Sequence, residues 1–260
     1  MNRLAAFGGV YSNHLALDAV VADARAAGAD AIHCLGDLGA FGPHPDRTCE
    51  TIREEGIPVV AGNYDRSIGL GLDDCQCGYT DPRDNLFASI SYRYTFANTS
   101  PRHRDWMRTL PATRRLDVGG KAALLAHGSP RRINEFLWET TTSDAFLVWL
   151  LDTAAVDLLL VTHTGLPWSR RLADGRTVVN VGAIGRPAND GDPRVVYPIV
   201  AVEDERIEVE WRRVAYDHQA LAEQMRAESL PEEFVETIET GWWTTCLEVL
   251  PAKERARGRH

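Results

Sequence analysis

The sequence predicts an α/β fold in which a largely parallel sheet is covered by helices on its faces. Over the first sixty residues, short apolar strands alternate with helical segments, at 4–7, 14–28, 31–35 and 45–55. This alternation is typical of parallel sheets, because each helix returns the chain to the starting edge of the sheet. The strands also end in glycine and polar residues, and ligands bind outside the carboxyl ends of such strands.

Each element of the first half has a local signal. The helix at 14–28 has Leu17, Val20 and Val21 on its apolar side, and Gly28 ends it. A third strand is expected at 57–61. Between residues 69 and 100 the pattern dissolves into Gly, Asp, Cys and aromatic residues, which we interpret as an inserted cap or loop, with a helix resuming at 102–110.

The second half adds hairpins and a helical tail. A hairpin is expected at 114–126 around Gly119-Gly120 and another at 172–180, because Asp174-Gly175 is a strong turn signal. The remaining expected elements are helices at 143–155, 218–228 and 231–239, strands at 157–161, 195–202 and 206–212, and a frayed charged end at 253–260. We therefore expect a main domain at 1–215, with the cap at 69–100, and a C-terminal helical extension at 216–260.

The composition excludes several classes of protein. The net charge of −9 argues against a surface that tracks the nucleic-acid backbone, but not against a small phosphorylated substrate held by local arginines. No run of 18 apolar residues is present, so no membrane span is expected. Five cysteines, scattered except for Cys75 and Cys77, do not form a disulfide framework, which favours a cytoplasmic location.

Four side chains with metal-binding chemistry follow the ends of apolar strands: Asp37, Asn63, His127 and His163. One carboxylate, one amide oxygen and two imidazoles suit Mn²⁺, Fe²⁺ or Zn²⁺ better than Ca²⁺ or Cu(I). The sequence therefore predicts a divalent metal site at these strand ends, with Mn or Fe favoured and Zn as the third choice.

Five motifs in order resemble those of the calcineurin-like metallophosphoesterases, in particular the small prokaryotic branch with a single compact domain. The resemblance covers about 1–203 and includes Gly36-Asp37, Gly62-Asn63-Tyr64-Asp65, His127-Gly128-Ser129-Pro130, Thr162-His163-Thr164-Gly165 and Val179 to Pro187. It implies a four-layer α/β/β/α sandwich and two metals bridged by Asp37. It also implies that Asp37, Asn63, His127 and His163 hold the second metal.

The ligands that the resemblance implies for the first metal are missing. The family's Asp-x-His falls on Gly9-Val10-Tyr11, and its last His falls on Gly165. The His that normally assists protonation of the leaving group is Tyr64. Glycine has no side chain to coordinate with, so we expect a mononuclear site, with one metal per chain.

Several other residues leave alternatives open. Tyr11 could bind Fe³⁺ as tyrosinate, and His14, His44 or the Cys75/Cys77 pair could supply ligands. Tyr11 and Tyr64 could equally be packing residues, His14 could occupy the first turn of a helix, and His44 could lie in a surface loop. The two cysteines could bind metal or perform redox chemistry. Trp242-Trp243 could pack on the domain or form a homodimer contact.

The predicted site combines these residues with local charges. We assign catalytic roles to Tyr64, Asp65 and His127, and substrate-binding roles to Arg131, Arg186 and Asn180. The favoured function is metal-dependent hydrolysis of a small phosphorylated substrate. The alternatives are a mononuclear Mn or Fe enzyme with lyase or redox chemistry, and an inactive binding or regulatory protein.

Overall fold

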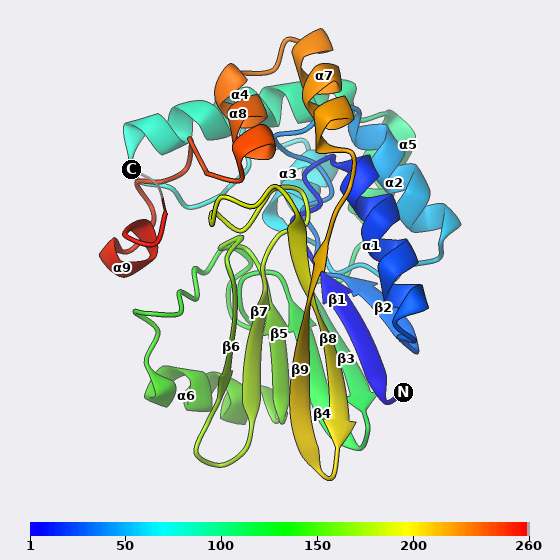
Figure 1. Ribbon diagram of the computed structural model, residues 1–260, viewed down its shortest axis with the longest axis vertical. Coiled ribbons are helices and arrows are strands. Elements are labelled where there is room, and N and C mark those ends of the chain that lie inside the picture. The colour runs from blue at the N-terminus through cyan, green and yellow to red at the C-terminus, as the bar shows by residue number, and fades with distance from the viewer. Residues whose placement is uncertain (259–260) are drawn as a thin grey trace.

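Two β-sheets form the centre of the computed structural model, which describes residues 1–258 (Figure 1). The first sheet has the order β2-β1-β8-β9 and contains β1 (Arg3–Phe7), β2 (Ala31–Cys34), β8 (Val195–Glu203) and β9 (Arg206–Val214). The second has the order β3-β4-β5-β7-β6 and contains β3 (Thr113–Val118), β4 (Lys121–Ala126), β5 (Leu158–Val161), β6 (Pro167–Arg171) and β7 (Thr177–Val181). Parallel pairing is confirmed between β1 and β2 and among β4, β5 and β7. The expectation of a largely parallel sheet was nevertheless wrong, because the pairs β1-β8, β8-β9, β3-β4 and β6-β7 are antiparallel and both sheets are mixed.

The alternation of side chains along the strands divides the core into layers. Leu4 of β1 and Leu160 of β5 belong to one apolar cluster, which lies between the two sheets. Phe7 points to the other face of its sheet, where it packs with the helices α1 (His14–Ala26) and α2 (Pro45–Glu54). Leu159 points to the outer face of the second sheet and packs with α6 (Asp144–Ala154). The mixed α/β fold is thus confirmed, with helices on the outer faces of both sheets.

The remaining helices gather at the end of the sheets where the polar motifs lie (Figure 1). They are α3 (Asn63–Leu70), α4 (Pro82–Asn98), α5 (Pro101–Met107), α7 (His218–Ala227), α8 (Glu232–Thr240) and α9 (Ala252–Arg255). Phe87 of α4 packs with Leu221 of α7 and Phe234 of α8 in a single apolar cluster. None of the helices in residues 1–258 is long and apolar enough to cross a membrane.

Three further expectations from the sequence were wrong. The predicted strand at 57–61 forms only one bridge, between Val59 and Cys34, because the chain turns away at once into α3. The segment at 69–100 is not irregular, since most of it forms the 17-residue helix α4, which Asp81 caps and Pro82 begins. The charged end is not frayed as far as residue 258, because Glu254 is buried and accepts a hydrogen bond from the Thr140 backbone N–H at 2.8 Å. Residues 259–260 lie outside the described part of the chain.

Candidate metal centre

Three of the predicted ligands converge in the structure. Asp37 follows β2, His127 follows β4 and His163 follows β5, and one ligand atom from each lies within 4.8 Å of the others. Oδ2 of Asp37 lies 3.3 Å from Nε2 of His127, which lies 3.2 Å from Nδ1 of His163. All three side chains are buried. Asp37 and His163 both have positive φ angles, of 56° and 53°, a strained conformation that clusters at functional sites.

Hydrogen bonds on the far side of each imidazole fix which nitrogen faces the centre. Nδ1 of His127 donates to the Leu35 carbonyl at 2.7 Å, and Nε2 of His163 donates to the Cys77 carbonyl at 3.2 Å. The lone pairs of His127 Nε2 and His163 Nδ1 therefore face each other. Two such lone pairs repel each other, so a proton or a metal cation must lie between them. Backbone carbonyls commonly orient metal-binding histidines in this way.

The surroundings of the two histidines shift their pKa values in opposite directions. Burial disfavours the imidazolium of His127, but the Asp37 carboxylate outweighs this effect and raises the pKa of His127. Burial, followed by the neighbouring His127, lowers the pKa of His163 to about 3. His163 is therefore neutral at neutral pH, as an imidazole must be to bind a metal.

Asn63 presents an unused oxygen at the start of α3. Its Nδ2 donates to the Cys75 carbonyl at 2.8 Å and to Sγ of Cys77 at 3.4 Å. Its Oδ1 is fully buried and has no hydrogen-bond partner in residues 1–258. Buried acceptors without partners are costly, so this oxygen is suited to be a ligand of a cation.

Asp65 holds the two loops of the centre together. Its carboxylate accepts hydrogen bonds from the backbone N–H groups of Asp37 at 2.8 Å, Leu38 at 3.0 Å and Gly62 at 2.8 Å. Burial and the negative charge of Asp37 raise the pKa of Asp65 to about 6. With its oxygens engaged by three backbone donors, Asp65 positions the Asp37 loop, and we no longer assign it a direct catalytic role.

The side chain of Tyr64 faces away from the centre. Its hydroxyl donates to Oγ of Ser91 on α4 at 3.0 Å, and only its backbone N–H reaches Oδ1 of Asp37, at 3.0 Å. The prediction that the phenol takes part in catalysis is not supported by this geometry. The sequence gave no sign that the Tyr64 side chain would point toward α4 and bind Ser91.

The residues considered as replacement ligands lie outside the cluster. Nη1 of Arg47 donates to Nε2 of His14 at 3.2 Å, so that nitrogen is already engaged. His44 lies 4.0 Å from Glu228. Burial raises the pKa of Tyr11, which disfavours the tyrosinate form. The only such cluster of His, Cys, Asp and Glu in residues 1–258 is the one formed by Asp37, His127 and His163.

Tyr11 and Arg186 lie next to Gly9 and Gly165, the two glycines that stand where the family has metal ligands. A Cβ atom at Gly9 would lie 2.9 Å from Cζ of Tyr11, and one at Gly165 would lie 3.2 Å from Nη2 of Arg186. Arg186 is 6% exposed, and its Cζ lies 3.3 Å from the ring centroid of Trp243. Its Nε is buried without a hydrogen-bond partner in residues 1–258. A permanent positive charge thus lies beside the His163 loop, and Trp243 packs on the domain to support it.

Cys75 and Cys77 form a disulfide, and neither is part of the metal cluster. Of the alternatives left open for these cysteines, metal binding is therefore not supported. Their contribution is instead through the backbone, since the Cys75 carbonyl accepts from Asn63 and the Cys77 carbonyl accepts from His163. The short bridge fixes both carbonyls. No sequence signal could have shown this, because the interacting atoms belong to the main chain.

Removing this bridge is expected to weaken metal binding by about 10- to 100-fold, the usual effect of losing groups that orient ligands. The variant is Cys75→Ser/Cys77→Ser, and the dissociation constant is measured by competition with a chromophoric chelator. Cys49→Ala, which removes a free buried thiol on α2, serves as the control. Unchanged affinity in the double variant would show that the bridge does not support the ligands.

Two residues predicted to bind substrate are engaged within the protein. Asn180 uses Nδ2 to bind the Thr162 carbonyl at 2.9 Å and Oγ1 of Thr164 at 2.8 Å, which fixes the loop carrying His163. We therefore reassign Asn180 to loop positioning. Arg131 pairs with Glu135, with its Nε 2.8 Å from Oε1.

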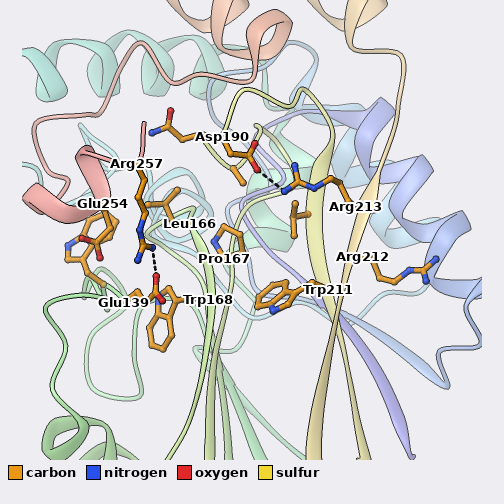
Figure 2. A pocket seen from close by; sticks show the side chains of 14 residues that line it. Glu139, Leu166, Pro167, Trp168, Asp190, Trp211, Arg212, Arg213, Glu254 and Arg257 are labelled. Atoms are coloured by element: carbon orange, nitrogen blue, oxygen red, sulfur yellow. Dashed lines mark hydrogen bonds and ion pairs between the residues drawn. The ribbon is translucent and has the colours of Figure 1, made fainter. Parts of the chain in front are cut away.

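Pockets lie beside two of the predicted ligands. A pocket of about 360 Å³ is lined by His127, and one of about 260 Å³ is lined by Asn63. A third, also of about 360 Å³, lies near β6 and β9 and is lined by none of the four predicted ligands (Figure 2). There Arg213 pairs with Asp190 and Arg257 with Glu139, as the dashed lines in Figure 2 show. Its arginine charges are thus partly compensated.

Comparisons with known proteins show the family and the fold of the chain. Residues 3–205 match the model of the calcineurin-like phosphoesterase superfamily domain. An uncharacterised protein of Methanocaldococcus jannaschii is 26% identical over 92% of this chain and 98% of its own length. A metallophosphoesterase from Sphaerobacter thermophilus is 27% identical in sequence. Its crystal structure matches with a TM-score of 0.68 and covers 92% of this chain and 99% of that one.

A hypothetical protein from Pyrococcus horikoshii OT3 has the same fold. It is 21% identical, with a TM-score of 0.76 over 94% of this chain and 100% of that one. The family match spans most of the chain and includes every residue of the metal cluster. This chain therefore belongs to the calcineurin-like phosphoesterase superfamily.

Proposed function

We propose that the protein is a metal-dependent phosphoesterase that hydrolyses a small phosphorylated substrate with one metal ion, held by Asp37, Asn63, His127 and His163. This proposal rests on one observation: Nε2 of His127 and Nδ1 of His163 lie 3.2 Å apart with their lone pairs facing each other, beside the Asp37 carboxylate. The unpartnered Oδ1 of Asn63 supports a fourth ligand. This set of oxygen and nitrogen donors suits Mn or Fe, with Zn as the third choice.

A divalent metal held by these residues would polarise a phosphoryl oxygen and lower the pKa of a bound water toward ~7. The residues of the chain supply the rest. Together with Asn63, Asp37 and the two histidines would supply four ligands. Four ligands do not complete an octahedron, so positions would stay open for water and substrate. Arg186 supplies a fixed positive charge beside Gly165, where it favours the negative charge of a phosphoryl group.

A second function has one specific observation in its favour. Side chains at Gly9 and Gly165 would meet Tyr11 and Arg186, and the two glycines supply no ligands for the two-metal clamp that the resemblance implies. A mononuclear Mn or Fe centre with lyase or redox chemistry is therefore the alternative. The cytoplasmic location and the homodimer remain predictions.

Metal-dependent hydrolysis of bis-p-nitrophenyl phosphate tests the proposed function. Protein stripped by a chelator is expected to lose turnover and to regain it when Mn²⁺, Fe²⁺ or Zn²⁺ is added back. The assay is then repeated on a wide panel of phosphoesters. Protein that keeps its metal but turns over none of them would refute the hydrolytic proposal and favour the alternative.

A further inference from the structure

The pocket beside His127 has a cationic lining within an acidic protein. Arg66, Arg108, Arg131 and Arg132 all line it, and no Asp or Glu does. The chain as a whole has a net charge of −9, so this concentration of arginines is contrary to its average composition. Local potentials of this kind attract anions to a cleft.

The four arginines are not equally available. Nη1 of Arg108 lies 3.4 Å from Asp105, and Arg131 is held by Glu135. Arg66 and Arg132 form no ion pair with any carboxylate in residues 1–258. Both are exposed. The pocket therefore offers two guanidinium groups whose charge is not compensated by a direct partner.

Both free arginines come from the segments that carry the predicted ligands. Arg66 lies three residues after Asn63 on α3, about one helical turn further on. Arg132 lies five residues after His127 in the loop that follows β4. Arg66 also lines the smaller pocket beside Asn63. The two pockets thus meet at Arg66, next to the metal centre.

The rest of the lining is suited to a carbon skeleton. Leu70, Met107 and Leu110 form apolar parts of the wall. The volume of about 360 Å³ is within the range of pockets that bind small molecules. A ligand with an apolar middle and an anionic end fits this combination.

We propose that this pocket is a subsite for a second anionic group of the substrate, so that the protein acts on organic molecules with at least two phosphoryl groups. One phosphoryl group lies at the metal centre, and the other is bound by Arg66 and Arg132. Guanidinium groups bind phosphate through paired, charge-assisted hydrogen bonds. This inference rests on the proposed function for the identity of the reacting group.

Binding of matched probes tests the subsite without turnover. Hexane-1,6-diol bisphosphate and hexyl phosphate share their carbon chain and differ by one phosphoryl group. Calorimetry on metal-loaded wild-type protein is expected to show the bisphosphate binding at least about 10-fold more tightly. Chelator-stripped protein is expected to lose this preference, because the second phosphoryl group then has no metal cation to bind. In Arg66→Gln/Arg132→Gln, this preference is expected to fall to about 2-fold or less, with metal content and melting temperature unchanged.

A charge-matched control separates local recognition from net charge. Arg25→Gln/Arg102→Gln removes two exposed arginines that pair with Glu55 and Glu50 elsewhere on the surface. This control is expected to keep the preference. If it loses the preference equally, or if Arg66→Gln/Arg132→Gln keeps it, the subsite is refuted. The single variants Arg66→Gln and Arg132→Gln give the same test if the double variant fails to fold.

The two proposals fail separately in this design. A preference that depends on Arg66 and Arg132 in a protein without phosphoesterase activity would leave the subsite in place and refute hydrolysis. Metal-dependent hydrolysis without any preference for the bisphosphate would refute the subsite alone.

Discussion

Replacing Asp37 by alanine is expected to weaken metal binding by more than about 100-fold and to abolish hydrolysis with it. Loss of a group that only orients a ligand costs about 10- to 100-fold, so loss of a ligand itself should cost more. Oδ2 of Asp37 is the only carboxylate oxygen in the cluster, and without it His127 and His163 face each other with no anion beside them. Metal affinity and phosphoesterase turnover are measured on the same preparation.

The fold should survive this substitution. The Asp37 loop is held by Asp65, which binds the backbone N–H of residue 37 and not its side chain. Circular dichroism and thermal melting check this point. Asp117→Ala, which removes an exposed carboxylate near the end of β3 that accepts a hydrogen bond from the Gly120 backbone N–H, serves as the control and should leave metal affinity unchanged. An Asp37→Ala protein that kept both metal and activity would overturn the ligand assignment.

Gly36→Ala is expected to reduce the free energy of unfolding by about 2–5 kcal/mol. Gly36 has a φ of +86°, where an alanine costs about 1–2 kcal/mol. Its Cβ would also lie 2.2 Å from the backbone nitrogen of Gly62 and 2.6 Å from the Val60 carbonyl oxygen. These atoms belong to the main chain, so the loops carrying Asp37 and Asn63 must separate, at a further cost of about 1–3 kcal/mol.

Gly56→Ala provides a matched comparison, because it separates strain from crowding. Gly56 has a φ of +63°, and a Cβ there would have no neighbour within 4 Å. Its replacement should therefore cost only about 1–2 kcal/mol, from the backbone conformation alone. Urea denaturation of metal-free protein measures both variants. Equal losses would show that close approach of the two loops does not matter for stability.

The convergence of Asp37, His127 and His163 could be predicted from the sequence because each of them follows an apolar strand. The carboxyl ends of β4 and β5, which are adjacent and parallel, bring His127 and His163 to one edge. Asp37 joins them from the facing sheet. Strand periodicity and family motifs are both local signals, and they were sufficient here.

The groups that support the ligands could not be predicted. Cys75 and Cys77 contribute main-chain carbonyls, which any residue type would supply. The Tyr64 hydroxyl donates a hydrogen bond to Ser91 on α4, a contact between distant segments. The helix α4 itself was missed because its apolar residues do not lie along a single stripe. It packs on several sides, with Ala88 and Tyr92 in one cluster and Phe87 in another.

The replacement of lost ligands is a different case. The sequence showed that Gly9 and Gly165 cannot coordinate a metal, but not that Tyr11 and Arg186 occupy the adjacent space. That relation depends on contacts between segments far apart in the chain. The guanidinium of Arg186 lies beside Gly165, and its positive charge would repel a second metal cation there.

We propose that the site holds one metal ion, and the metal content per chain measures this directly. Plasma emission spectroscopy is performed on wild-type protein purified without added metal, with Asp37→Ala beside it. The account predicts about one Mn, Fe or Zn per wild-type chain and essentially none in Asp37→Ala. Two metals per wild-type chain, both lost in Asp37→Ala, would overturn this proposal, because a second ion would then bind although Gly9 and Gly165 supply no ligands.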